Sequence, residues 1–156
     1  MIKPIFRQAK PEDFEEVLSF IQAYYAFDDI PFRSAEVAAA LRALLSDVSL
    51  GQVWIIGTEE KAVGYTILTF GFDLEFGGSV AIVTELYIES RFRRCGIGRQ
   101  AIQFLENICR DLEVTVLELQ VERDNPEAQE FYRSLGFQAH ERIPLSKRLV
   151  TQTNLA

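Results

Sequence analysis

Cysteine and histidine are scarce in this sequence, which contains two cysteines, Cys95 and Cys109, and one histidine, His140. The cysteines lack the CxxC spacing of a zinc site and are too few for a disulfide framework, so burial of apolar side chains has to stabilise the fold. Free thiols are typical of a reducing compartment, and we therefore expect a cytoplasmic protein without a metal. His140 has no neighbouring ligand pattern, so we expect it to have no catalytic role.

Long apolar runs and positive charge are also lacking. No run reaches the about 18 apolar residues that a membrane helix needs, and Met1 to Arg7 do not begin a signal peptide. Lysine and arginine number 16 against 23 aspartates and glutamates, a formal net charge of -7. Since such a surface repels phosphate, we expect neither a membrane nor a nucleic acid as partner. Cationic small molecules or basic peptides fit the charge better.

The residues that are present suit one globular domain. Of the 156 residues, 48% are apolar and 25% are charged, which is an ordinary globular balance. No linker or internal repeat is visible, so residues 1–156 are expected to form a single domain.

The spacing of apolar residues predicts alternating strands and helices. Strands are expected over 2–8, 52–58, 61–71, 81–88 and 115–121, with a final pair over 137–141 and 145–150. Helices are expected over 11–26, 34–45, 97–112 and from Pro126 to a stop at Gly136. This order predicts an α/β layer around a mixed sheet.

A glycine turn between a buried strand and a strong helix is the first chemical motif. It reads Arg93-Arg94-Cys95-Gly96-Ile97-Gly98-Arg99 and gathers positive charge in an acidic protein. Glycine lets a backbone approach a ligand closely, and the free amides at a helix N-terminus favour phosphate. A Walker loop is excluded because no Gly-Lys-Ser/Thr follows, and a dinucleotide fingerprint needs a third glycine. The alternative is a tight turn with solvated arginines.

The second motif runs from Asn125 to Phe137 and reads N-P-E-A-Q-E-F-Y-R-S-L-G-F. With it the chain resembles the GNAT superfamily of N-acetyltransferases. In that family a strand with an acceptor-side carboxylate leads into an R-x-x-G-x-G loop, and a later strand leads into an Asn-x-x-Ala-x-x-Phe-Tyr-x-x-x-Gly-Phe helix. Glu85, the loop from Arg93 to Gly98 and the second motif match these parts in order, across nearly the whole chain. Arg94 departs from the pattern, because the family often has glycine there.

The resemblance implies an α+β fold with a mixed, mostly antiparallel central sheet of about six to seven strands and about four flanking helices. It also implies acetyl-CoA as the acyl donor, with its pantetheine arm between two central strands that splay apart. The residues implied in cofactor binding are Leu86, Tyr87, Ile88, Arg93, Arg94, Gly96, Ile97, Gly98, Arg99, Asn125 and Ala128.

Glu85 and Tyr132 are the candidate catalytic residues. An attacking amine has to lose a proton, and Glu85 interrupts an apolar strand where it can serve as the base. Tyr132 supplies a phenol that can protonate the departing thiolate. The alternatives are a structural carboxylate at Glu85, bonded to a neighbouring strand or an arginine, and a packing role for Tyr132. Neither cysteine has a positioned histidine, so direct transfer in a ternary complex is favoured over an acyl-cysteine.

Mixed aromatic and acidic segments are candidates for binding a cationic acceptor. They supply Tyr25, Asp28, Asp29 and Glu75, and the alternative is an exposed acidic surface. The favoured function is acetylation of a primary amine of a small molecule or peptide. A CoA-binding sensor without turnover is the alternative, and a nucleic-acid module that uses the arginines is disfavoured by the net charge. A homodimer is suggested only by analogy with relatives.

Overall fold

The computed structural model describes residues 1–149 of the chain. It contains two compact units, Met1–Gln120 and Val121–Ala156, of which the second is described to residue 149. The expectation of one domain over 1–156 therefore stays a prediction.

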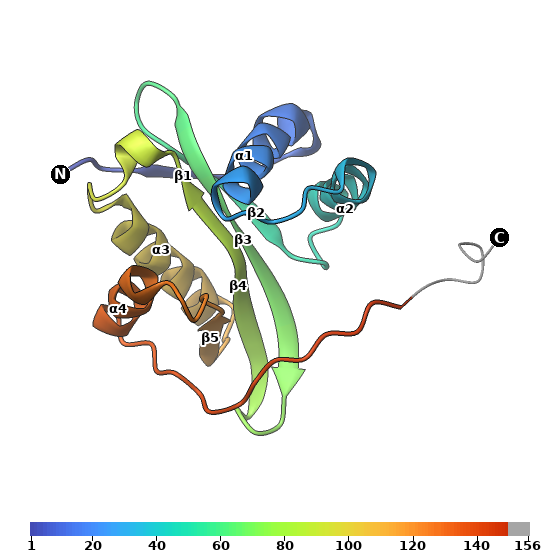
Figure 1. The fold of residues 1–156 in the computed structure, drawn as a ribbon, viewed down its shortest axis with the longest axis vertical. Coiled ribbons are helices and arrows are strands. Elements are labelled where there is room, and N and C mark those ends of the chain that lie inside the picture. The colour runs from blue at the N-terminus through green and yellow to red at the C-terminus, as the bar shows by residue number, and fades with distance from the viewer. Residues whose placement is uncertain (150–156) are drawn as a thin grey trace. The chain divides into compact units, whose positions relative to one another are not determined.

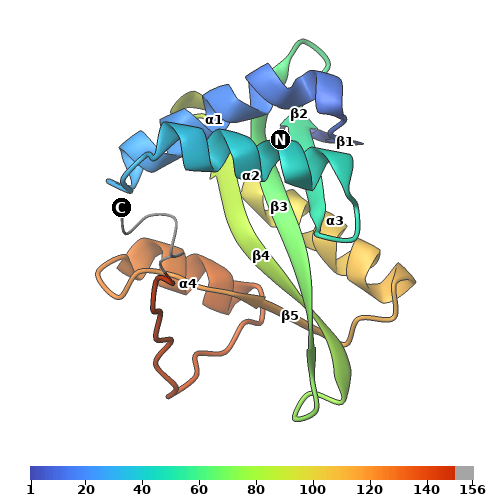
Figure 2. The same ribbon diagram turned by 90° about the vertical axis from the view of Figure 1, so that its right-hand side faces the viewer.

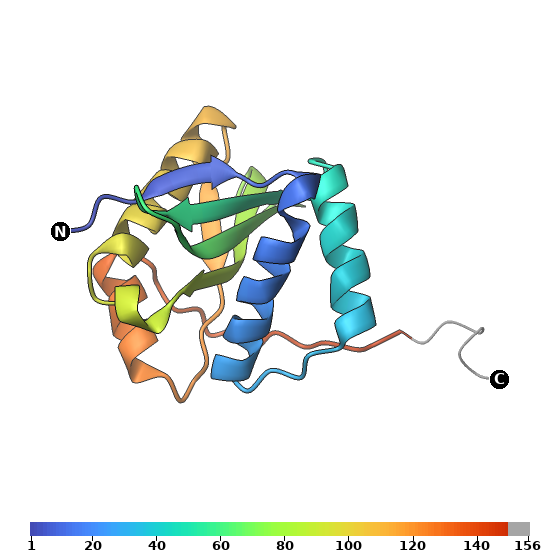
Figure 3. The same ribbon diagram turned by 90° about the horizontal axis from the view of Figure 1, so that it is seen from above.

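The first unit carries one five-stranded sheet with helices on both faces. Its strands lie in the order β1-β2-β3-β4-β5, and neighbours are antiparallel except for the parallel pair β4 and β5. Helices α1 and α2 cover one face and α3 covers the other (Figures 1 and 3). The elements are β1 (Ile5–Gln8), α1 (Phe14–Phe27), α2 (Ser34–Ser46), β2 (Gln52–Gly57), β3 (Ala62–Asp73), β4 (Gly78–Ile88), α3 (Ile97–Asp111) and β5 (Val116–Leu119).

Each face of the sheet has its own apolar core, because successive side chains of a strand point to opposite faces. On the α1 and α2 face, Val17 and Leu41 pack with the cluster that includes Tyr65 and Ile67 of β3. On the α3 face, Leu105 packs with the cluster that includes Leu68, the next residue of β3. The predicted mixed, mostly antiparallel sheet is confirmed.

A β-bulge at Thr84 decides which way Glu85 points. Strands β3 and β4 form a long antiparallel hairpin (Figure 2), in which Ile67 pairs with Glu85 but Leu68 pairs with Val83. Thr84 is therefore an extra residue, and it exchanges the faces of the residues that follow it. Val83 packs towards α3, whereas Glu85 faces the opposite side of the sheet.

The second unit contains α4 (Pro126–Ser134), whose ends are built as the sequence predicts. Oδ1 of Asn125 accepts the N–H of Ala128 at 3.0 Å, and Pro126 occupies the first turn. After the helix, Gly136 adopts a positive φ of 97°, and the N–H of Phe137 donates to the carbonyl of Tyr132 at 3.1 Å. This is a Schellman stop, which glycine favours because it has no Cβ. With α4, the expected four helices are present.

The expected final strands are not formed over 137–141 or 145–149, and residue 150 lies outside the described part. A strand needs a neighbour for its backbone groups and a face to bury. Most side chains of this segment are exposed, with 65% of Ile143 and 91% of Leu145 accessible, and Pro144 has no N–H to donate. The described residues therefore hold five strands, fewer than the six to seven expected.

Candidate active site

Glu85 is held between two tyrosines that come from different elements. Its Oε1 accepts the hydroxyl hydrogen of Tyr65 from β3 at 2.6 Å, and its Oε2 accepts that of Tyr25 from α1 at 2.8 Å. Each carboxylate oxygen therefore accepts one hydrogen bond from a phenol. The side chain is half-buried, so it lies inside the α1 side of the sheet while keeping some exposure.

The environment keeps both phenols protonated. Burial raises the pKa of Tyr65, and the negative charge of Glu85 and the hydrogen bond to it raise that pKa further. Burial also raises the pKa of Tyr25, and the hydrogen bond to Glu85 adds to this effect. Two permanent donors therefore fix the orientation of the carboxylate.

Aromatic rings surround the carboxylate on the α1 face. The ring of Tyr87 lies 6.3 Å from that of Tyr65 and 6.0 Å from that of Tyr24, and the ring of Phe32 lies 5.9 Å from that of Tyr25. These rings come from α1, the loop after it, β3 and β4. Such a cluster offers ring faces and one carboxylate to an organic cation.

Strands β4 and β5 part beside Glu85. They pair only from Val80 with Val116 to Val83 with Leu119, where β5 ends, while β4 continues along β3 to Ile88. Residues 84–88 therefore have no strand partner on the β5 side within the described chain. Leu86, Tyr87 and Ile88, the residues expected to line a cofactor arm, all lie in this stretch.

The glycine turn forms the N-terminus of α3. Gly96 is the N-cap in the left-handed region, with φ 83°, and it supplies no side-chain cap. Helix geometry leaves the first N–H groups of α3, such as those of Ile97 and Gly98, without an intrahelical acceptor. An open hollow of about 540 Å³ lies at this turn, and its lining includes Arg94 and Gly96. First-turn amides, positive charge and a helix dipole fit a diphosphate.

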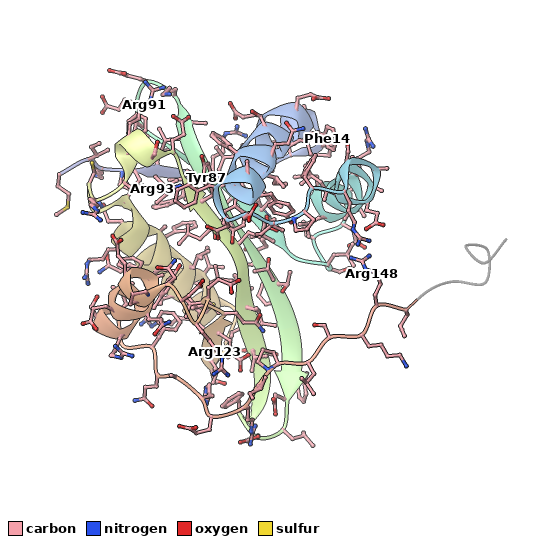
Figure 4. All side chains as sticks on the ribbon, in the orientation of Figure 1. Phe14, Tyr87, Arg91, Arg93, Arg123 and Arg148 are labelled. Atoms are coloured by element: carbon pink, nitrogen blue, oxygen red, sulfur yellow. The ribbon has the colours of Figure 1, made fainter. Side chains whose placement is uncertain are left out.

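Arg93, one of the residues expected to bind the cofactor, contacts the end of β4 and the end of α1. Its Nε donates to the carbonyl oxygen of Ile88 at 2.8 Å. Its guanidinium carbon lies 3.9 Å from the ring centre of Phe27 and 5.4 Å from that of Tyr87, the neighbour labelled beside it in Figure 4. These contacts direct the cation towards the end of α1.

The expected acceptor residues lie in two places. Tyr25 bonds to Glu85, and Asp28 and Asp29 follow directly at the exposed end of α1. Glu75 instead lies in the turn between β3 and β4, whose last pair joins Asp73 to Gly78. At roughly 3.4 Å per residue, this turn is about 20 Å from Glu85 along the hairpin, so the structure does not bring Glu75 to the cluster.

Tyr132 lies in α4 of the second unit, among aromatic side chains. Its ring centre is 5.0 Å from that of Phe131 and 5.7 Å from that of Phe137. Burial raises the pKa of Tyr132 to about 12, so the phenol keeps its proton at neutral pH. Asn125 and Ala128 bond to each other at the start of the helix, which occupies the Ala128 amide.

The Cys109 thiol is not activated for nucleophilic chemistry. Burial raises the pKa of the Cys109 thiol, which disfavours the thiolate. The thiol of Cys95 donates to the carbonyl of Arg93 at 3.3 Å. His140 is exposed. Among residues 1–149, no three His, Cys, Asp or Glu side chains gather as metal ligands.

Sequence reasoning missed Tyr65, Gly64 and Phe27. Tyr65 resembles any core residue of an apolar strand, and only the pairing of β3 with β4 brings it to Glu85. A side chain at Gly64 would collide with the carbonyl oxygen of Tyr87, so glycine allows the two strands to approach there. Strand alternation places Tyr65 and Ile67 on the same face of β3. No local signal in the sequence shows which residues of β4 pair with them.

A model of the Acetyltransferase (GNAT) family matches residues 12–137. Among solved structures, an integron cassette protein from the mobile metagenome of Cole Harbour Salt Marsh is similar over 94% of this chain and 91% of its own, with 27% identity and a TM-score of 0.81. A possible acetyltransferase from Clostridium difficile 630 is similar over 97% of this chain and 100% of its own, with 20% identity and a TM-score of 0.83.

An aminoglycoside acetyltransferase from an uncultured soil metagenomic sample, solved in complex with sisomicin, is similar over 95% of this chain and 97% of its own. Its identity is 18% and its TM-score is 0.77, so this likeness concerns the fold. Within residues 1–149, no helix combines the length and apolar character that crossing a bilayer requires. The family match covers most of the chain and the site lies within it, so the chain belongs to the GNAT family of acetyltransferases.

Proposed function

We propose that this acetyltransferase acetylates a primary amine of a small molecule or peptide, by direct transfer in a ternary complex. The observation that carries the proposal is the Glu85 carboxylate, held by Tyr25 and Tyr65 beside the point where β4 and β5 part. A general base has to lie within hydrogen-bond reach of the proton that it takes, directly or through one water. Glu85 combines a fixed orientation with partial exposure, which suits this role.

The donor implied by the family is acetyl-CoA, which supplies the acetyl group as a thioester when bound. The first-turn amides from Gly96 to Arg99 and the charge of Arg94 suit its diphosphate. The end of β4 that does not pair with β5 suits the extended, amide-bearing pantetheine arm of the donor. The backbone groups there belong to Leu86, Tyr87 and Ile88. Asn125 and Ala128 are retained as further candidates at the start of α4.

Three groups of the chain would carry the chemistry. Glu85 would accept a proton from the amine, and the hydroxyl of Tyr132, protonated at neutral pH, would hold a proton for the departing sulfur. The N–H of Tyr87 or of Ile88 would stabilise negative charge on the carbonyl oxygen. The high pKa of the Cys109 thiol disfavours the competing acyl-cysteine route for that residue.

The acceptor would approach the aromatic cluster around Glu85. Tyr25 lies in this cluster, and Asp28 and Asp29 follow it at the end of α1, so the region combines ring faces with negative charge. Such a region suits an organic ammonium ion. The net charge of -7 favours the approach of cations to the protein as a whole.

A thiol-release assay with a panel of primary amines tests the proposal. We expect free CoA thiol and an acetylated amine by mass spectrometry, and initial-rate lines that intersect when donor and acceptor are varied together. Parallel lines would indicate an acyl-enzyme instead. If calorimetry showed that CoA binds but no amine of the panel caused thiol release, the alternative of a CoA-binding sensor without turnover would be favoured.

A further inference from the structure

Arg93 joins the glycine turn to the end of α1. It is held at one side by the bond from its Nε to the carbonyl of Ile88, the last residue of β4. Only Arg94 and Cys95 separate it from Gly96, the N-cap of α3. Its position is therefore coupled to the backbone of the turn.

The guanidinium packs on the ring of Phe27, the last residue of α1. The distance of 3.9 Å to the ring centre is well within the about 6 Å over which a cation and a ring attract each other. Phe27 is 63% exposed, so few apolar contacts hold its ring. Because Arg93 covers one face of that ring, the arginine helps to fix where α1 ends.

The end of α1 is linked in turn to Glu85. Phe27 precedes the loop to α2, in which the ring of Phe32 packs edge-on against Tyr25 at 5.9 Å. Tyr25 donates to the Glu85 carboxylate. A displacement of the end of α1 would therefore move one of the two groups that orient Glu85.

We propose that Arg93 is a positioning residue that couples the glycine turn to the acceptor side of the site, and that it is not a phosphate ligand. This inference rests on the proposed function for its kinetic consequence. Its structural content, that Arg93 fixes the end of α1, holds independently of the reaction. The expected kinetic signature is a higher KM for the amine with little change in CoA affinity.

Hydrogen exchange and kinetics on five variants of the full chain test this. Arg93→Ala and Phe27→Ala each remove one partner of the contact, and the double variant completes a cycle. Arg93→Lys keeps the charge but lacks the Nε bond and the planar group. Arg91→Ala is the matched control, because Arg91 lies in the same segment, pairs with Glu89 at 3.4 Å, and its loss also removes one positive charge. Thermal melting verifies that each variant folds.

We expect amide exchange over residues 25–32 to become about 3- to 10-fold faster in Arg93→Ala and in Phe27→Ala, with no further increase in the double variant. Arg93→Lys should resemble Arg93→Ala, and Arg91→Ala should resemble the wild type. The amine KM should rise by a similar factor, while calorimetry gives a CoA Kd within about twofold of the wild type.

The opposite pattern would overturn the inference. If Arg93→Ala weakened CoA binding severalfold without changing exchange over 25–32, and Arg93→Lys restored it, Arg93 would be a phosphate ligand. If the exchange pattern appeared but no amine were acetylated, the positioning contact would stand and the proposed function would fail. Normal exchange with normal acetylation in Arg93→Ala would reject the positioning role alone.

Discussion

The hydroxyl of Tyr65 donates to Oε1 of Glu85 at 2.6 Å, so a buried residue of β3 fixes the carboxylate of β4. The two residues are 20 positions apart in the sequence and belong to neighbouring strands. Tyr25 completes the arrangement from α1. The orientation of Glu85 thus depends on the packing of a helix and two strands.

Replacing Glu85 by glutamine should remove the base while keeping the shape of the side chain. We expect kcat/KM for the amine to fall by about 100- to 10,000-fold, the range associated with a positioned general base. The CoA Kd, measured by calorimetry, should be unchanged. Glu89→Gln is the control, because Glu89 pairs with Lys61 and Arg91 outside the cluster. Equal activity of Glu85→Gln and Glu89→Gln would remove Glu85 from the chemistry.

Replacing Tyr65 by phenylalanine should destabilise the fold. The buried hydroxyl bonds to a carboxylate, and a hydrogen bond to a charged group contributes about 1.5–3 kcal/mol. We expect urea unfolding to show a loss of that size. Tyr25→Phe removes a comparable bond at a half-buried position, so its loss should be smaller. A larger loss of stability in Tyr25→Phe than in Tyr65→Phe would contradict the greater burial of Tyr65.

The same tyrosine predicts how stability depends on pH. Because the pKa of Tyr65 is raised in the folded protein, the unfolded chain loses this proton first, near pH 10. The contribution of Tyr65 is therefore complete below about pH 10 and declines above it, by up to about 1.4 kcal/mol per pH unit. The stability difference between wild type and Tyr65→Phe should narrow as the pH rises from 9 to 11. A constant difference in urea unfolding would refute this.

Tyr132→Phe should reduce kcat with little effect on folding, because the packing of its ring against Phe131 and Phe137 is kept. A lost general acid corresponds to about 100-fold or more in rate. With the pKa of Tyr132 at about 12, the wild-type kcat should not decline through loss of this proton below about pH 10. Stopped-assay pH profiles of kcat check both points. If Tyr132→Phe kept the wild-type kcat, Tyr132 would have a packing role and would not be the general acid.

Gly96 and Gly77 offer a matched pair for the glycine turn, since both have φ 83°. Alanine at either position should cost about 1–2 kcal/mol of stability, because a Cβ disfavours the left-handed region. At Gly96 the Cβ would also lie 3.4 Å from Met1, whereas nothing lies within 4 Å at Gly77. Only Gly96→Ala should weaken CoA binding in calorimetry. Equal CoA affinities of the two variants would show that the glycine turn at Gly96 does not bind the cofactor.

Much of the fold was predictable because its signals are local. The apolar spacing of α3 and the cap and stop of α4, at Asn125 and Gly136, each act within a few residues. The two strands expected after Gly136 are not formed up to residue 149, because strand formation depends on contacts that are distant in the sequence. Strand formation there needs a partner and a buried face, and neither is supplied within the segment up to residue 149.

The sequence by itself determined the order of the elements as far as α4, the glycine turn at a helix start and the motif pair that marks the family. Only the tertiary structure decided that Thr84 forms a bulge, that Tyr25 and Tyr65 bond to Glu85, and that Arg93 turns towards Phe27. Periodicity and capping depend on neighbours along the chain. The direction of a side chain in a sheet depends on strand register, which one extra residue reverses and which only the paired strands define.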